Sequence, residues 1–589
     1  MKIKKLISKF LFILLITITS CQRDFIDSGD ASQTEIIPDT FSHYFGNEIS
    51  RDFIGNVVDT NSNPIVGVII TIGDQTTTTD TNGVFIINDA TINERFGYVK
   101  AEKAGYIHAS RSVVPSNGTN KVTIMMLEET VAGSVNSGSS STITTADGSS
   151  VSFDGNFIKE DGTAYSGSVD VIVHHLDPTD DDMELQMPGM LYAQNEDGEE
   201  RMLQTLGMLD VELRGSGGED LNLAEGSTSE IRMPVDPSLL NIAPATIPLW
   251  YFDEAKGYWI EEGEATLQGN MYVGTVSHFS FWNCDIPARA INLCVTVTTE
   301  DGIPFANAEV TITSITYGTR SGLTNNLGEV CGLVPSEESL ELNVYDPNVC
   351  DANSLLTQSI GPYTTDSAIT VIVPDNTYLV QETITGVLNT CDGDAVTNGY
   401  VELTYEGQTL LINVTNGSFE FQLMRCSTND NNAFTLTATD FTNLQTTESL
   451  EYNLTSPTTN IGEINTCLDQ DGYIQYVIDD SITVFYTDFI DVILGEERFV
   501  IYQVTNGYFL ADFPAQVGSY TVSTNNTNNL EFEVPGSGSI TTGQENITIN
   551  VTYVGTGVGD FINLNFSGTF TNLGTTSTIN GDAHVRIDL

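Results

Sequence analysis

Short runs of alternating apolar and polar residues, each ended by Gly, Asn, Asp or Pro, follow one another along most of this 589-residue chain. Alternation with a period of two is typical of half-buried β-strands, and no apolar period of 3.6 residues extends beyond about two helical turns. Hydrophobic residues make up 40% of the chain, which is enough for folded cores. Because the length exceeds what one core supports, the sequence predicts an all-β protein of several domains.

One short motif recurs along the chain and marks repeated units. Thr-Asn-Gly-x-Phe occurs around Gly83 (TNGVF), Gly417 (TNGSF) and Gly507 (TNGYF), and the variant TNNLGEV occurs around Gly328. The last three glycines in chain order are 89 and 90 residues apart. A second motif, a small or Pro-bearing turn before an alternating strand, accompanies the first three copies; it is found at 63–72, 303–312 and 394–403. Self-similarity of this kind indicates tandem domains.

The first copy, TDTNGVF, begins like a calcium-binding loop, so its Asp80 has two interpretations. In the later copies Val414 and Val504 stand where Asp80 does, and a shared calcium loop is therefore excluded. Asn-Gly favours the positive φ angles of a type I′ hairpin. We predict a turn at each copy.

Residues 55–87 (GNVVDTNSNPIVGVIITIGDQTTTTDTNGVFII) resemble a carboxypeptidase regulatory-like domain, a transthyretin-like β-sandwich. The resemblance extends over roughly 50–128, where Gly105-Tyr106 matches a typical turn of the family; it is weaker in the second copy and partial in the third. The family is a non-catalytic accessory module, so the resemblance implies a fold and no activity. The region 129–286 contains a series of segments that includes IPLWYFDEAKGYWIEEG and VSHFSFWNCD. In their order these segments distantly resemble the β-rich region beside the transthyretin-like module of cartilage intermediate layer protein.

We therefore predict tandem small β-sandwich domains, transthyretin-like or immunoglobulin-like, on an N-terminal lipid anchor. The predicted divisions are a signal peptide (1–20), a tether (21–49), the carboxypeptidase regulatory-like sandwich (50–128), a β-rich middle domain (129–286), a transthyretin-like sandwich (287–375), a further sandwich repeat (376–466) and one or more C-terminal β domains (467–589). Within the middle domain, Trp250 and Trp259 flank DEAKG and predict an aromatic hairpin.

The anchor is predicted from the first residues of the chain. A lysine-rich start precedes the short apolar run FLFILLITI, which is too short to cross a bilayer. Ile18-Thr19-Ser20-Cys21 follows and resembles the bacterial lipobox, which implies cleavage before Cys21 and diacylglycerol on its thiol. The next residues, QRDFID, partly resemble the surface-export signal of Bacteroidota lipoproteins, although Phe25 and Ile26 depart from it. The expected location is the outer membrane, with the chain exposed at the cell surface.

The charge of the chain is strongly negative, with 79 acidic and 21 basic residues and a formal net charge of −58. Such a surface argues against nucleic acid as a partner and suits a soluble extracellular protein. The first module is an exception, because six basic residues between Arg51 and Leu127 nearly balance seven acidic ones. This local balance has two explanations, proximity to an anionic membrane leaflet and uneven sampling of a composition.

Seven cysteines remain after Cys21, and all lie beyond residue 280. Exported proteins can form disulfides, and the repeat register predicts the pairs Cys294–Cys331 and Cys391–Cys426, each joining a first strand to the strand after the Gly turn. Loops of this size contribute about 3–4 kcal/mol. The other three are Cys284, Cys350 and Cys467, and they leave one odd thiol. The alternative is that all are buried free thiols. Cys-x-x-Cys is absent, which argues against zinc and thioredoxin-type sites.

Few residues point to bound ions or modifications. His174 and His175 are adjacent, and neighbouring residues of a strand face opposite ways, so they do not readily share a metal. The acidic loop after them is a calcium candidate with hard oxygen ligands, against the alternative of a solvated loop; its carboxylates are Asp177, Asp180, Asp181 and Asp182. Asp-Ser-Ala and Asp-Ser-Ile resemble the Bacteroidota O-glycosylation sequon and mark Ser367 and Ser481.

No motif for nucleophilic catalysis or phosphate binding occurs in the sequence. We expect a cell-surface lipoprotein without enzymatic activity or cofactor, in which β-domains form a scaffold for binding or adhesion to an extracellular glycan or protein. Two alternatives remain: an accessory subunit of an outer-membrane transport complex, and a hydrolase with its site in 129–286. The hydrolase requires a deep pocket with convergent carboxylates or histidines.

Overall fold

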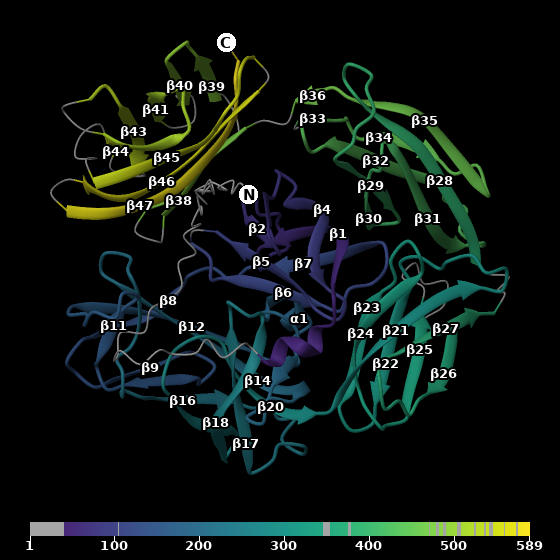
Figure 1. Ribbon diagram of the computed structural model, residues 1–589, viewed down its shortest axis with the longest axis horizontal. Helices are drawn as coiled ribbons and strands as arrows, with labels where there is room; N and C mark the ends of the chain where they lie inside the picture. The colour runs from purple at the N-terminus through teal and green to yellow at the C-terminus, as the bar shows by residue number, and fades with distance from the viewer. Residues whose placement is uncertain are drawn as a thin grey trace, which may run out of the picture. The chain divides into compact units, whose positions relative to one another are not determined.

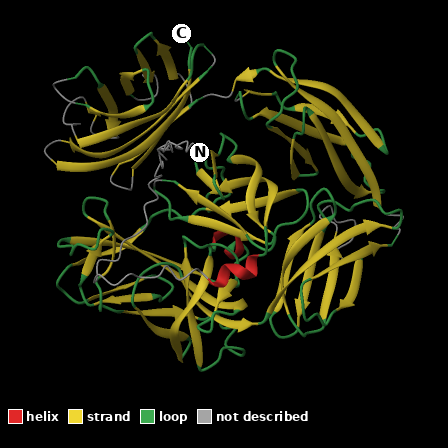
Figure 2. Ribbon diagram, in the orientation of Figure 1, coloured by secondary structure: helices red, strands yellow, loops and turns green. Residues whose placement is uncertain are grey.

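The computed structural model describes residues 40–588, with these gaps: 104, 346–353, 375–378, 444, 470–471, 479–481, 487–489, 504–507, 523–525, 535–537, 541–545, 559 and 573–574. Two compact units divide the chain, Met1–Thr40 and Phe41–Leu589. Strands dominate the described residues, and helix is limited there to η1 (Thr40–Phe45) and α1 (Met183–Gln186) (Figure 2). The expected all-β, multi-domain class is confirmed. No helix in the described ranges is long and apolar enough to cross a membrane.

The first module is a sandwich of two sheets, with strand orders β4-β1-β7 and β3-β2-β5-β6 (Figure 1). Its strands are β1 (Glu48–Val58), β2 (Ile69–Ile72), β3 (Gln75–Thr78), β4 (Val84–Asn93), β5 (Gly97–Glu102), β6 (Ala109–Val113) and β7 (Thr119–Met125). The alternating residues predicted to face a core do so: Phe53, Ile70, Phe85 and Val99, from both sheets, are fully buried together.

Two later modules repeat this arrangement. The second sandwich has the sheets β24-β21-β27 and β23-β22-β25-β26, and the third has β31-β28-β35 beside a sheet built on β30-β29-β32. The second contains β21 (Ala290–Thr299), β22 (Glu309–Ser314), β23 (Gly318–Leu323), β24 (Glu329–Pro335), β25 (Leu340–Tyr345), β26 (Leu356–Ile360) and β27 (Ser367–Val373). The third contains β28 (Leu379–Thr390), β29 (Gly399–Tyr405), β30 (Gln408–Asn413), β31 (Ser418–Cys426), β32 (Ala433–Asp440), β33 (Gln445–Thr446), β34 (Leu450–Asn453) and β35 (Thr458–Thr466).

The pairing of the first strand is the same in all three sandwiches. It is antiparallel to the strand that follows the Gly turn and parallel to the last strand of the module: β1 with β4 and β7, β21 with β24 and β27, β28 with β31 and β35. The two sequence motifs therefore mark equivalent places in one repeated strand arrangement.

Packing against the first strand explains why glycine recurs in the motif. The carbonyl oxygens of Gly83, Gly328 and Gly417 accept the N–H groups of Val57, Val297 and Leu388, the equivalent residues of the three first strands, at 2.6–2.8 Å. All three glycines have φ between 69° and 77°. A Cβ on Gly83 would lie 2.6 Å from the carbonyl oxygen of Val57, so both the positive φ and the close approach require glycine.

The predicted type I′ turn is wrong for the first copy. Gly83 has a positive φ, but Asn82 is not among the residues with one. Instead, Asp80 Oδ1 accepts the backbone N–H groups of Asn82 and Val84, both at 2.9 Å. The second copy is built the same way, with Asn325 Oδ1 accepting from two backbone N–H groups at 2.8 and 3.1 Å. A side-chain carbonyl or carboxylate thus holds these two turns.

The third copy has Val414 in place of this acceptor and adopts a different turn. Asn416 and Gly417 both have positive φ, 47° and 77°, and Thr415 and Ser418 exchange backbone hydrogen bonds. This is the two-residue type I′ geometry. The predicted turn type is therefore confirmed only where no side-chain acceptor competes. The fourth copy, around Gly507, lies outside the described residues.

The middle domain is one large sheet whose longest strand is buried on both faces. Its strands are β8 (Val131–Asn136), β9 (Ser141–Thr144), β10 (Ser150–Phe153), β11 (Phe157–Lys159), β12 (Ser168–Leu176), β13 (Tyr192–Gln194), β14 (Glu200–Gly215), β15 (Asp220–Leu223), β16 (Ser229–Pro234), β17 (Thr246–Asp253), β18 (Tyr258–Gln268), β19 (Met271–Val276) and β20 (Trp282–Ala288). On β14, Leu209 joins one core, whereas Met208 joins another that includes Trp250 and Trp259. The predicted aromatic hairpin is confirmed as β17–β18, with both tryptophans fully buried.

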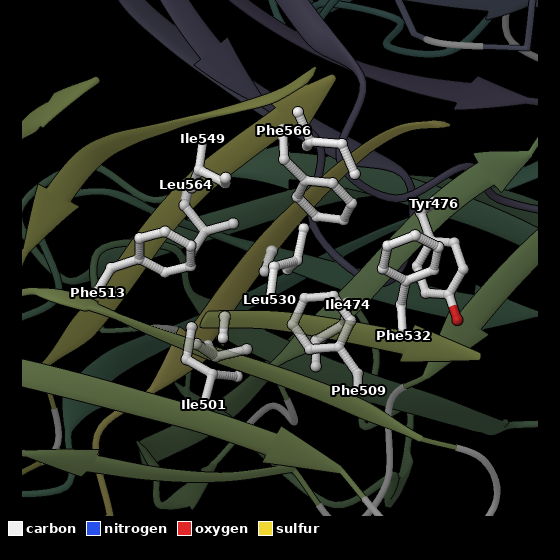
Figure 3. Close-up of a cluster of buried hydrophobic side chains, with 14 of the residues drawn as sticks. Ile474, Tyr476, Ile501, Phe509, Phe513, Leu530, Phe532, Ile549, Leu564 and Phe566 are labelled. Atoms are coloured by element: carbon white, nitrogen blue, oxygen red, sulfur yellow. The ribbon is translucent and has the colours of Figure 1, made fainter. Parts of the chain in front are cut away.

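The C-terminal domain packs two sheets, β38-β37-β47-β46-β45-β42 and β39-β40-β41-β43-β44. After β36 (Leu468–Asp469), which pairs with β33, its strands are β37 (Tyr473–Ile478), β38 (Ile482–Tyr486), β39 (Ile490–Leu494), β40 (Arg498–Gln503), β41 (Phe509–Pro514), β42 (Gly518–Thr521), β43 (Asn529–Val534), β44 (Gly538–Ile540), β45 (Asn546–Val554), β46 (Phe561–Asn572) and β47 (Thr575–Arg586). Figure 3 shows Phe509, Phe532 and Phe566 among the side chains of this core.

The disulfides agree with the repeat register in the second sandwich and differ from it in the third. Cys294 and Cys331 lie opposite each other on β21 and β24 and are bonded (S–S 2.06 Å). The predicted pair Cys391–Cys426 is wrong, because Cys391 is bonded to Cys467. Cys426 is disulfide-bonded as well.

Strand register explains the third-sandwich result. Cys331 stands three residues after its turn glycine, whereas Cys426 stands nine residues after Gly417 and lies opposite Leu379, at the far end of β28 from Cys391. Cys391 and Cys467 each follow the end of one of two parallel, paired strands, β28 and β35. Cys284, the remaining described cysteine, is a buried free thiol.

Candidate functional site

The two adjacent histidines face different partners, as the alternation of a strand requires. His174 Nε2 lies 3.0 Å from the carbonyl oxygen of Glu128, and His175 Nδ1 lies 3.1 Å from Asp147 Oδ2. Burial is the main cause that lowers the pKa of each ring. They do not converge on one point, so this part of the chain offers no paired imidazole site.

The four carboxylates of the calcium candidate are dispersed in local turns. Asp177 accepts hydrogen bonds from the backbone N–H and the hydroxyl of Thr179, at 2.9 and 2.7 Å, and Asp182 precedes α1. Within the described ranges, the sole group of three or more metal-ligating side chains whose ligand atoms lie within 4.8 Å of one another is Cys294, Glu329 and Cys331, whose cysteines form a disulfide. The carboxylates of Asp177, Asp180, Asp181 and Asp182 do not form such a group, and calcium binding at this loop stays a prediction.

Of the residues predicted to carry modifications, one is described. Ser367 begins β27 and donates to the carbonyl oxygen of Thr365 at 2.9 Å. The preceding Asp366 pairs with Arg95 at 2.7 Å. Ser481 and the lipobox Cys21 lie outside the described residues, and modification at all three positions stays a prediction.

The middle domain contains buried carboxylates, the type of group that the hydrolase alternative requires. Asp210 on β14 is fully buried, and neither of its carboxylate oxygens has a hydrogen-bond partner. Burial raises the pKa of Asp210 well above its usual range and also raises the pKa of Glu212. Arg214 pairs with Glu212 at 2.8 Å and with Glu129. Neither Asp210 nor Glu212 lines either of the cavities described next. Asp210 is fully buried, whereas the side chains of Glu212 and Arg214 are 21% and 17% exposed.

One hollow, with a volume of about 490 Å³, lies between three modules. It is lined by β6 and β7 with the loop between them, by the segments around α1 and the start of β14, and by β23 and β24 (strands labelled in Figure 1). A smaller cavity of about 110 Å³ lies beside Asp80 and His584. Ligand sites for small molecules have volumes of roughly 300–1,000 Å³, which makes the larger cavity the candidate binding site.

Three cations line the large cavity. Arg111 comes from β6, Lys121 from β7 and Arg320 from β23. In the described part of the chain, none of the three forms an ion pair with a carboxylate. Acidic residues outnumber basic ones by 79 to 21, so unpaired cations gathered at one place need a specific explanation.

The two arginines are held in place by backbone carbonyl groups. Arg111 Nη1 donates to the carbonyl oxygens of Met187 and Gly189, both at 3.3 Å, and Arg320 Nη2 donates to that of Leu203 at 3.1 Å. Arg111 Nη2 is enclosed and has no acceptor. Burial lowers the pKa of Arg111 to about 10 and also lowers that of Arg320. Both guanidinium groups are therefore fixed in orientation and poorly solvated.

Lys121 combines two properties that suit a side chain facing a hollow. Its side chain is exposed, and Nζ donates to Asn307 Oδ1 at 2.9 Å. The surrounding protein nevertheless lowers the pKa of Lys121 to about 8 through desolvation.

The rest of the lining is mainly apolar, with two carboxylates near its edge. Methionine and leucine side chains predominate on the middle-domain side: Met187, Met190, Leu191, Met202 and Leu203. Glu329 is engaged by the Asn117 side chain and backbone N–H at 3.0–3.2 Å. Glu184 is exposed and is the acidic group whose charge acts on both arginines. Methionine-rich walls adapt to the shape of a bound group.

Sequence reasoning missed this site, because its residues come from three segments more than 60 residues apart. One signal was present: the first module is nearly neutral in a strongly acidic chain, and two of its six basic residues are Arg111 and Lys121. The two explanations considered for the near-neutral charge of the first module, proximity to a membrane and uneven sampling of a composition, did not connect these cations with a binding cavity.

Comparisons with known proteins add little to the geometry. No protein-family model and no curated protein matches the chain. Among solved structures it is similar to the TIE protein of Bacillus anthracis, at 10% identity and a TM-score of 0.14, over 71% of this chain and 50% of that one. It is also similar to BcpA, the major pilin subunit of Bacillus cereus, at 10% identity and a TM-score of 0.12, over 72% of this chain and 100% of that one. A streptococcal ancillary pilin matches at 8% identity and a TM-score of 0.14, over 39% of this chain and 96% of that one.

The chain thus spans half the length of the first of these structures. All three are far below the identity at which likeness extends to function, and their TM-scores carry no argument about this chain. The all-β, multi-domain class stands on the strands themselves.

Proposed function

We propose that this chain is a cell-surface lipoprotein without enzymatic activity, whose tandem β-domains form a scaffold that binds an extracellular glycan or protein. The observation that carries the proposal is the threefold recurrence of one sandwich arrangement behind a lipobox-like start. Such serial modules hold a binding surface away from a lipid anchor. We also propose that the sandwiches are of the carboxypeptidase regulatory-like, transthyretin-like type.

Three further observations support this reading of the chain. The acidic balance of 79 to 21 suits an exposed protein and opposes nucleic-acid binding. Two disulfides join described residues, and disulfides persist outside the reducing cytoplasm. Asp210, the carboxylate of the middle domain whose pKa burial raises well above its usual range, is fully buried, whereas catalysis on an external substrate needs access to solvent.

The anchor and the exposure are tested together on cells. The wild-type chain should fractionate with the outer membrane and be removed by protease added to intact cells. Cys21→Ala should move it to the soluble fraction, and Cys284→Ala, which alters a cysteine unconnected with lipid, should leave it in the membrane. The proposal would be refuted if Cys21→Ala stayed in the membrane fraction, or if the wild type on intact cells resisted external protease.

The binding role is tested by capture. Crosslinking on intact cells, followed by purification of the chain, should recover an extracellular glycan or a surface protein. Consistent recovery of an outer-membrane barrel protein instead would replace the scaffold role with that of an accessory transport subunit.

A further inference from the structure

The cations of the large cavity have no use in a purely structural scaffold. Burying a guanidinium costs free energy unless a charge partner offsets it, and this chain has many carboxylates available as partners. Arg95 illustrates the usual solution, because it pairs with Glu200 at 3.2 Å and Asp366 at 2.7 Å. Arg111 and Arg320 are also confined between modules, yet neither has such a partner.

The geometry of these groups fits recognition of an anion. Arginine presents a rigid, planar fork of donors that matches a carboxylate, and Arg111 and Arg320 are fixed by backbone carbonyl groups before anything binds. Lys121 adds a third positive charge from β7, the next strand along the chain, which belongs to the other sheet of the first module. Arg111 Nη2 lacks an acceptor, which indicates that the local hydrogen bonding is incomplete without a further group.

The apolar part of the lining narrows the class of anion. Inorganic ions keep their hydration and gain nothing from methionine and leucine walls, whereas an apolar body does. A volume of about 490 Å³ also exceeds what a single inorganic ion occupies. Small-molecule sites typically combine such walls with a few convergent polar groups.

We propose that the cavity lined by Arg111, Lys121 and Arg320 binds a small organic carboxylate with an apolar body. The carboxylate lies against the two guanidinium groups, and the apolar body lies against the middle-domain wall formed by Met187, Met190, Leu191, Met202 and Leu203. The site is distinct from any glycan- or protein-binding surface of the scaffold and does not depend on the lipid anchor.

The test uses naphthalene-2-carboxylate and its neutral isostere, naphthalene-2-carboxamide, titrated into the purified full chain by calorimetry. The carboxylate should bind with one-to-one stoichiometry and at least tenfold more tightly than the amide. Arg111→Met and Arg320→Met should each weaken carboxylate binding about tenfold or more, because each removes a charge-assisted contact while keeping the length of the side chain. Arg289→Met is the matched control, since Arg289 is exposed and does not line the cavity.

A second variant guards against misfolding. Lys121→Met alters an accessible side chain, so its melting temperature without ligand should equal that of the wild type while carboxylate binding falls. Equal binding of carboxylate and amide, unchanged affinity in the Arg111 and Arg320 variants, or no saturable binding at millimolar concentration would each overturn the proposal. Inorganic phosphate binding as tightly as the naphthalene carboxylate would refute the role of the apolar wall.

Discussion

Asp80 is the residue for which the turn and calcium interpretations make opposite predictions. Its Oδ1 accepts two backbone N–H groups at 2.9 Å, and its Oδ2 accepts the hydroxyl of Tyr400 at 2.6 Å. Alanine at position 80 leaves the buried N–H of Val84 without this acceptor. A hydrogen bond to a charged group contributes about 1.5–3 kcal/mol, and an unsatisfied buried donor costs about 1–3 kcal/mol. Since the Asn82 N–H can turn to solvent, we expect Asp80→Ala to destabilise the turn by about 2–4 kcal/mol.

Asn at the same position is the matched control, and the chain supplies the precedent. Asn325 accepts the equivalent two N–H groups in the second sandwich at 2.8 and 3.1 Å. Asp80→Asn should therefore keep both backbone bonds and lose only part of the Tyr400 contact, at a cost of about 1 kcal/mol or less. Tyr400→Phe removes that contact together with the hydrogen bond that the Tyr400 hydroxyl accepts from Asn82 Nδ2 at 2.8 Å, and it should leave both backbone bonds to Asp80 in place.

Hydrogen–deuterium exchange followed by mass spectrometry measures the effect locally, which matters in a protein of several domains. Amides in peptides covering 76–90 should exchange about 30- to 1,000-fold faster in Asp80→Ala, since each 1.4 kcal/mol is tenfold. Asn325→Ala should produce the same change around 322–332 and none around 76–90. Exchange in Asp80→Ala within twofold of the wild type would contradict the reasoning. An Asp80→Asn variant as labile as Asp80→Ala, with the wild type matching it after calcium chelation, would restore the calcium interpretation.

Three further predictions concern other parts of the chain. Replacing Cys391 and Cys467 by Ser should lower the free energy of unfolding of the third sandwich by about 4 kcal/mol, because the disulfide closes a loop with a sequence separation of 76. Peptide mapping of the wild type without reduction should recover these two cysteines linked to each other. A peptide that links Cys391 to Cys426 would contradict the assignment. Burial lowers the pKa of His584 from 6.5 to about 4, so the imidazole is protonated at a lower pH in the folded C-terminal domain than in the unfolded chain. The free energy of unfolding of this domain should therefore fall by up to about 3 kcal/mol as pH falls from about 6.5 to 4. Urea unfolding at several pH values should show that loss in the wild type, and His584→Gln should lack this part of it. Lys121 shares its cavity with two arginines, Glu184 and Glu329. Because desolvation lowers the pKa of Lys121 to about 8, its side chain loses its positive charge as pH rises from 7 to 9. Naphthalene-2-carboxylate should therefore bind the wild type more weakly as pH rises over that range, and its affinity for Lys121→Met should not change.

Local patterns predicted the strands better than they predicted the turns. Alternation in 48–58 or 246–268 is set by one buried face, which is a property of the segment itself and its neighbours. The conformation at Asn82-Gly83 depends on a residue two positions earlier, because a carboxylate at position 80 competes with the type I′ geometry that Asn-Gly otherwise favours. Where Val414 replaces that acceptor, the dipeptide preference prevails.

Spacing between cysteines failed for a comparable reason. Separations of 37 in the second sandwich and 35 in the third are nearly equal, but disulfides form between residues that the strand register brings together. Cys426 stands six residues further along its strand than Cys331 does, which carries it to the other end of the sheet. Chain separation alone does not contain that information.

The cavity was the least predictable feature. Arg111 and Lys121 come from consecutive strands of one module, one in each sheet. The rest of the cavity wall includes Met187 and Leu203 of the middle domain and Arg320 of the second sandwich, which is some 200 residues further along the chain. Assembly of such a site depends on how modules pack, and hydrophobic periodicity describes only each module on its own.

The parallel pairing of first and last strands has a mechanical consequence. In each sandwich the chain enters along one strand and leaves along its parallel neighbour, so tension applied to the two ends pulls these strands in opposite directions along their length. The hydrogen bonds between them are then loaded together in shear instead of being opened one after another, which raises the force needed for unfolding. In the third sandwich the bond between Cys391 and Cys467 joins the same two strands at their exit end. The 75 residues between these cysteines, about 250 Å of extended chain, therefore add nothing to the extension even if that module unfolds.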